Sequence, residues 1–64
     1  MNVEEFAGER VRAEFPLAFD DTQRIPIRLN EIQRALKLLD RDDRNDAEVL
    51  AQMKRQLFDL RASL

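Results

Sequence analysis

An all-α fold is predicted by three features of this 64-residue sequence. Each of its three asparagines stands three residues before Glu or Gln, in NVEE, NEIQ and NDAE, which is the spacing of a helix N-cap and its reciprocal partner. Apolar residues recur at helical intervals after each of these sites. Both prolines fall within residues 15–30. We therefore predict a single small domain over residues 1–64, with a short N-terminal helix, an ordered proline-containing loop and a C-terminal antiparallel helical hairpin.

The first helix is expected over residues 3–14, after an N-cap at Asn2. Its apolar stripe consists of Val3, Phe6, Ala7 and Val11. Pro16 is expected to end it, because the residue before a proline is pushed out of the α region. Gly8, the only glycine of the chain, either allows a neighbour to approach closely or weakens the helix by about 1 kcal/mol relative to alanine.

Residues 15–29 are predicted to form an ordered loop and not a free linker. Pro26 lies in the alternating stretch RIPIR and excludes a central strand, because proline lacks the N–H that a β-ladder needs. Six large apolar side chains fall in this segment: Phe15, Leu17, Phe19, Ile25, Ile27 and Leu29. Leaving them exposed would forfeit about 1.5 kcal/mol or more apiece. We expect the loop either to close the small core or to dock on a partner.

Two further helices are expected over residues 31–40 and 46–63, starting after Asn30 and Asn45. The first carries Ile32, Ala35, Leu36 and Leu39 on one face, with Leu38 on its flank. The second carries a seam of Leu50, Met53, Leu57, Leu60 and Leu64, beside a second apolar line of Ala47, Ala51, Phe58 and Ala62. Because the two lines cover more than half of the circumference, this helix should touch two neighbours. Its second half needs a cover from the first helix or from another molecule.

The residue types argue against enzymatic chemistry. The chain has no His, Cys, Tyr or Trp, which removes the commonest general base, nucleophile and metal ligands. The stretch DRDDRNDAE suggests a calcium loop. Arg44, Asn45 and Ala51, however, stand where such a loop needs an oxygen ligand, a glycine and a bidentate glutamate. We predict no catalytic residue, no metal, no cofactor and no small-molecule substrate.

A predicted helix followed by EFPLAF, a short polar turn and IPI resembles the start of the ProQ/FinO family of RNA chaperones. In that family a helix leads to a Phe-Pro step, a second aromatic residue and a proline-containing apolar segment. The resemblance covers residues 6–27 and implies RNA binding. The rest of the chain departs from the family: it is too short for such a domain, lacks the later basic and aromatic positions, and has a net charge of -2. We therefore do not assign the chain to this family.

By elimination, we predict a non-enzymatic interaction protein, such as a regulator, adaptor or inhibitor, that presents an apolar helical surface to itself as a homodimer or to another protein. The expected interface residues are Met53, Leu57, Phe58, Leu60 and Leu64, with Phe15, Phe19 and Ile25 as second candidates. A cytoplasmic location with no membrane contact is expected. No apolar run approaches the roughly 18 residues of a membrane span, and the N-terminus lacks the residue order of a signal peptide.

The alternative prediction is a small dimeric nucleic-acid-binding regulator that uses the basic segment 24–44. Its candidate contacts with phosphate or another anion are Arg24, Arg28, Arg34, Lys37 and Arg41. The competing interpretation is a solvated helix face whose cations pair with Glu31, Asp40 and Asp42. The net charge of the whole chain, -2, does not by itself favour nucleic acid.

Overall fold

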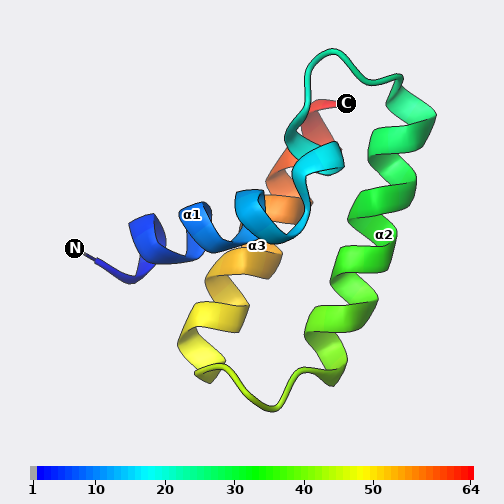
Figure 1. Cartoon of the computed structure of the whole chain (residues 1–64). Coiled ribbons are helices and arrows are strands. Elements are labelled where there is room, and N and C mark those ends of the chain that lie inside the picture. The colour runs from blue at the N-terminus through cyan, green and yellow to red at the C-terminus, as the bar shows by residue number, and fades with distance from the viewer. Residues whose placement is uncertain (1) are drawn as a thin grey trace.

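The computed structural model describes residues 2–64 and contains only helices and connecting turns over that range (Figure 1). The elements are α1 (Val3–Glu14), the 3-10 helix η1 (Pro16–Phe19), α2 (Ile25–Arg41) and α3 (Ala47–Ser63). α2 and α3 form an antiparallel hairpin, and α1 crosses α3 and makes its most extensive contacts with it. The predicted all-α fold class and helical hairpin are confirmed. No helix among residues 2–64 combines the length and apolar character needed to cross a membrane.

The start and end of α1 agree with the prediction. The Asn2 backbone is extended, and its side-chain Oδ1 accepts a hydrogen bond from the backbone N–H of Glu5 at 2.9 Å. This satisfies one of the donors that the first turn of a helix leaves unpaired. At the other end, the backbone N–H of Phe15 donates to the carbonyl of Val11 at 2.9 Å, and Pro16 then begins η1. Local sequence therefore sets both ends of α1.

The predicted loop over residues 15–29 and the predicted helix over 31–40 need correction. α2 begins at Ile25, with Arg24 as its N-cap residue and Pro26 in its first turn. Proline is tolerated there, because the first turn of a helix does not use its own N–H groups and the fixed φ of proline suits the helix. Asn30 is consequently an exposed residue inside the helix and not its N-cap.

The remainder of the predicted loop is ordered, as expected, but it is shorter and partly helical. Ala18 of η1 is fully buried, and Phe15 just before η1 is 7% exposed. η1 packs against α2, where the Arg28 Nε donates to the carbonyl oxygen of Ala18 at 3.1 Å. The segment between α1 and α2 thus closes one end of the core.

The N-cap of α3 is Asp46 and not Asn45. The Asp46 carboxylate accepts a hydrogen bond from the backbone N–H of Glu48 at 3.0 Å. The side chain of Asn45 is instead engaged with Arg10 and Asp42. The prediction fails by one residue because a contact with a distant part of the chain takes the side chain that the local pattern assigned to capping.

All three α-helices and η1 contribute to one apolar core. The buried side chains are Ala7, Val11, Phe15, Ala18, Ile32, Ala35, Leu39, Val49, Met53 and Leu57. Leu50, Leu60 and Leu64 are partly buried against it, so the seam predicted on α3 does face the core. The second apolar line of α3 is exposed along its whole length. The neighbours of α3 within the chain, α1 and α2, therefore do not cover that line.

Gly8 lies where α1 and α3 approach each other closely. The Gln56 Nε2 donates to the carbonyl oxygen of Glu4 at 3.2 Å. A Cβ placed on Gly8 would lie 3.2 Å from both the Nε2 and the Oε1 of Gln56. Of the two interpretations of this glycine, close approach by a neighbour is the one observed, and the neighbouring atoms are the far end of a flexible side chain.

We expect Gly8→Ala to raise the free energy of unfolding by about 0.5–1 kcal/mol, because alanine costs less backbone entropy in mid-helix. The exposed end of Gln56 needs to move by only a few tenths of an ångström. Urea unfolding followed by circular dichroism measures the change. A Gln56→Ala background, which removes the crowding, should show the full gain. A loss of stability in the wild-type background would mean that Gln56 cannot move aside.

Candidate interaction surface

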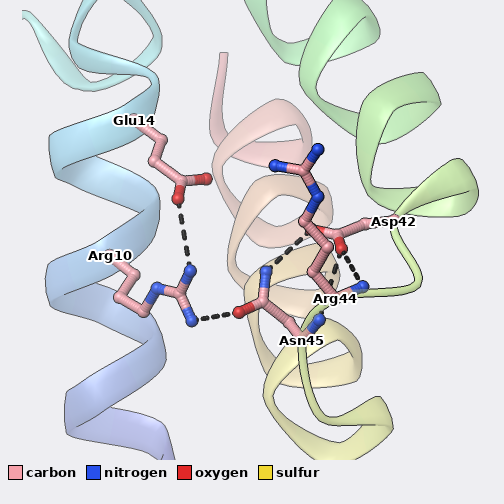
Figure 2. Close-up of polar contacts among 5 residues, drawn as sticks. All are labelled: Arg10, Glu14, Asp42, Arg44 and Asn45. Atoms are coloured by element: carbon pink, nitrogen blue, oxygen red, sulfur yellow. Dashed lines mark hydrogen bonds and ion pairs between the residues drawn. The ribbon is translucent and has the colours of Figure 1, made fainter.

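The most connected polar cluster joins α1 to the turn between α2 and α3 (Figure 2). The Arg10 guanidinium donates to the Oδ1 of Asn45 and pairs with Glu14 at 3.4 Å. Asn45 in turn donates through Nδ2 to the Oδ2 of Asp42 at 2.7 Å. The Oδ1 of Asp42 accepts from the backbone N–H of Arg44 at 2.8 Å. These bonds link residues 35 positions apart, so the cluster fixes α1 against the hairpin turn.

Two carboxylates have a pKa that their surroundings lower, which favours the ionised form. The backbone N–H of Arg44 and then the Asn45 side chain lower the pKa of Asp42 below its ordinary value of 3.8. The hydroxyl of Thr22 and then its backbone N–H lower the pKa of Asp20 in the same way. Hydrogen bonds to a carboxylate favour its charged form. Neither group is suited to general-acid catalysis near neutral pH, and both serve the turns in which they lie.

Acid should weaken the fold through Asp42. Because its folded-state pKa is lowered, this carboxylate stabilises the fold above its ordinary pKa of 3.8, and the contribution is lost as the pH falls through the lower folded value. We expect the free energy of unfolding to fall below about pH 4, with a smaller fall for Asp42→Asn. Urea midpoints measured from pH 7 to pH 2.5 test this. Asp43→Asn removes the same charge from the same turn outside the cluster and should follow the wild type; identical profiles for both variants would contradict the prediction.

The predicted interface residues divide into three groups by exposure. Met53, Leu57 and Phe15 belong to the core of the chain itself, so in this fold they do not offer a contact surface. Leu60, Leu64 and Phe19 are partly buried against that core. Phe58 and Ile25 are exposed to solvent, by 46% and 49% of their surface. α1 provides the cover that the second half of α3 needed.

The predicted basic residues also differ in exposure: one side chain is mostly buried, and the other four residues are exposed. The side chain of Arg28 is only 11% exposed; its guanidinium bonds to Ala18 and pairs with Asp21 at 3.6 Å, so it stabilises the fold. Arg24 is exposed at the start of α2. The other three cations, Arg34, Lys37 and Arg41, are exposed along α2.

The ion pairs that would neutralise this part of α2 do not form. Asp40 pairs with Lys54 on α3 at 2.5 Å, and Asp42 is bonded within its own turn. Over residues 2–64, none of the α2 cations Arg34, Lys37 and Arg41 has a carboxylate within ion-pair distance. The structure therefore leaves three neighbouring positive charges free on one helix.

Two large apolar side chains share this face of α2. Ile27 is 43% exposed and Leu38 is 56% exposed, and helical spacing places them in line with Arg34 and Arg41. We call Ile27, Arg34, Lys37, Leu38 and Arg41 the outer face of α2. At its C-terminal end, a shallow hollow is lined by Leu38, Arg41, Asp42, Asp43 and Arg44.

The sequence-based prediction did not include the apolar part of the outer face of α2, because it placed Ile27 in a loop and Leu38 on a helix flank. The signal that would have found it is the position of Pro26, which suits the first turn of a helix as well as it suits a loop. Extending the helix back to residue 25 brings Ile27 onto the line of Leu38.

The fold and this surface define a small three-helix protein with a mixed basic and apolar face on its second helix. Comparison of the chain with protein-family models, with curated proteins and with solved structures gave no match. The resemblance of residues 6–27 to the ProQ/FinO family is thus not accompanied by a family match. Among residues 2–64, no cluster of three or more side chains is suited to hold a metal ion.

Proposed function

We propose that this protein is a non-enzymatic protein–protein interaction module whose contact surface is the outer face of α2. One observation carries the proposal: Ile27 and Leu38 are 43% and 56% exposed beside three cations that have no ion-pair partner among residues 2–64. Burying apolar area yields about 25 cal/mol per Å², and complementary charge directs the encounter. A cytoplasmic location is part of the proposal.

The chemistry of the face favours an acidic, amphipathic helix of another protein as its occupant. Such a helix lays apolar anchors along a helical face at three- and four-residue spacing, and its carboxylates would meet the free cations of α2. A second copy of the same face is a poor occupant. It would bring Arg34, Lys37 and Arg41 opposite the same three cations, with only Glu31 on each helix to offset them.

We propose that the protein is not an enzyme, because its residue types do not suit catalysis. The sequence has no His or Cys, and the two carboxylates with shifted pKa values, Asp20 and Asp42, are shifted away from the neutral range. General-acid catalysis at neutral pH needs the opposite shift.

A synthetic acidic amphipathic helix, compared with a peptide of the same composition in scrambled order, is a suitable probe. We expect the wild type to bind the amphipathic probe, with an affinity that falls as salt is raised. Leu38→Ser and Arg34→Glu should each weaken binding about tenfold or more, while Arg55→Glu on the exposed side of α3 should not. Fluorescence anisotropy gives the affinities. Equal binding of both peptides, or unchanged binding by the two α2 variants, would contradict the proposal.

The same free cations give a second candidate function, a nucleic-acid-binding regulator. Phosphate contacts make such binding strongly salt-dependent. A generic single-stranded RNA and a generic DNA duplex test it at low salt. Steeply salt-dependent binding that is lost in the Arg34→Ala, Arg41→Ala double variant and kept in Leu38→Ser would favour nucleic acid over protein. No retention of either probe at low salt would exclude this candidate.

A further inference from the structure

The outer face of α2 carries its charge unevenly along the helix. Its two apolar side chains, Ile27 and Leu38, lie about 16–17 Å apart along the axis, at 1.5 Å per residue. With 3.6 residues per turn, they fall within about 20° of one line on the helix surface. The face therefore offers two separate apolar contacts, and each has its own charged surroundings.

Leu38 is surrounded by cations. Arg34 precedes it by four residues and Arg41 follows it by three, which makes both arginines its neighbours on the helix surface. Lys37 has the same spacing to the two arginines and lies between them. None of these three cations has an ion-pair partner among residues 2–64.

The hollow at the C-terminal end of α2 adjoins Leu38 and adds one cation, Arg44, and two carboxylates, Asp42 and Asp43. The Asp42 carboxylate already accepts hydrogen bonds from the backbone N–H groups of Arg44 and Asn45 and from the Asn45 side chain. Together with the three cations of the helix, four positive charges face two negative ones. The end of the face around Leu38 is thus positive, with a hollow beside its apolar contact.

The charges around Ile27 cancel. Arg24 precedes Ile27 by three residues and Glu31 follows it by four, so one cation and one carboxylate are its neighbours on the helix surface. Neither forms an ion pair within residues 2–64. Arg28, the next residue in the chain, is paired with Asp21. This end of the face thus has no excess of positive charge, and Glu31 lies on it.

We infer that the partner of the outer face of α2 is a helix that carries its carboxylates around one of two apolar anchors and none around the other. The inference rests on the proposed function and names the charge pattern of its partner. The anchor with carboxylates packs beside Leu38 at the hollow, where the carboxylates meet Arg34 and Arg41. The other anchor packs on Ile27. A carboxylate beside this second anchor would meet Glu31, and like charges placed together across an interface oppose binding.

Two synthetic helical peptides of equal length, composition and apolar anchors test the pattern. In the one-end peptide all carboxylates flank one anchor, and in the two-end peptide they are divided between both anchors. A hydrocarbon cross-link on the solvent side gives the two peptides equal helicity, which circular dichroism verifies. By fluorescence anisotropy at low salt, we expect the wild type to bind the one-end peptide about tenfold more tightly than the two-end peptide.

Glu31→Lys should remove most of this preference, because it gives the carboxylates of the two-end peptide a cation to meet beside Ile27. The two-end peptide should therefore bind this variant about tenfold more tightly than it binds the wild type. Glu9→Lys is the matched control: it makes the same charge change at an exposed residue inside α1, and it should leave the ratio of the two affinities unchanged. Circular dichroism shows whether both variants are folded.

The outcomes separate this inference from the proposed function. If the wild type binds both peptides equally, or binds the two-end peptide more tightly, the charge pattern is wrong while the outer face of α2 remains a binding surface. A preference that persists unchanged in folded Glu31→Lys also overturns the pattern. If neither peptide binds, the proposed function itself fails, and this inference fails with it.

Discussion

Replacing Leu57 with alanine should lower the free energy of unfolding by about 2–5 kcal/mol, the range for truncating a buried leucine, because the surroundings relax only partly into the cavity. Leu57 has no exposed surface and belongs to the core to which α1, α2 and α3 all contribute. A chain of this size has a total stability of only a few kcal/mol. The variant should therefore be largely unfolded at 37 °C, which thermal and urea unfolding followed by circular dichroism will show.

Leu38→Ala is the matched control for this substitution. It removes the same atoms from a leucine that is 56% exposed, and it should change stability by less than about 1 kcal/mol, since exposed positions contribute little packing. Equal losses for the two leucines would mean that Leu57 does not lie in the core. Both variants should be compared at low protein concentration, because association contributes to apparent stability.

Replacing Asn30 with proline should cost about 3 kcal/mol or more. Asn30 is the sixth residue of α2, where its N–H is expected to donate to the carbonyl four residues earlier. Proline removes that donor and clashes with the same carbonyl. Because the Asn30 side chain is exposed, the loss reports on the backbone and not on the core. Urea unfolding measures it, and proline tolerated without loss would place the helix start near residue 30.

Asn30→Ala also tests whether Asn30 lies inside α2, because the change in stability has opposite signs inside a helix and at an N-cap. In the interior of a helix, alanine is favoured over asparagine by about 0.6 kcal/mol, so the variant should be slightly more stable than the wild type. At an N-cap the same change would cost about 1 kcal/mol. Asn2→Ala, at an asparagine that does cap a helix, provides the destabilised reference.

The three asparagines show how far the sequence predicts this fold. The cap at Asn2 depends only on residues 2–5 and is confirmed. η1 packs against α2, whose start the local pattern misplaced, and the side chain of Asn45 is held by Arg10, 35 residues away. A local pattern cannot weigh such distant contacts. Two of the three predicted starts are consequently wrong, by six residues and by one.

The candidate surfaces likewise combine features that helical spacing predicted with features that only the fold shows. Helical spacing predicted a basic face that contains Arg34, Lys37 and Arg41, and all three are exposed. The spacing of Met53 and Leu57 predicted an apolar seam, which the structure confirms, but an apolar seam looks the same whether its cover is α1 or another molecule. Only the fold shows that α1 covers it and that Ile27, Leu38 and Phe58 remain exposed.

Local features of the chain were enough to predict that the protein is all-helical, where α1 begins and ends, and which seam of α3 is apolar. These follow from periodicity, caps and prolines, which act over a few residues. Three further features became clear only from the folded chain: α2 begins at Ile25, Asp40 and Asp42 bond to residues other than the cations of α2, and Ile27, Leu38 and Phe58 stay exposed. Those outcomes depend on contacts between residues far apart in the chain, whose energies no local pattern contains.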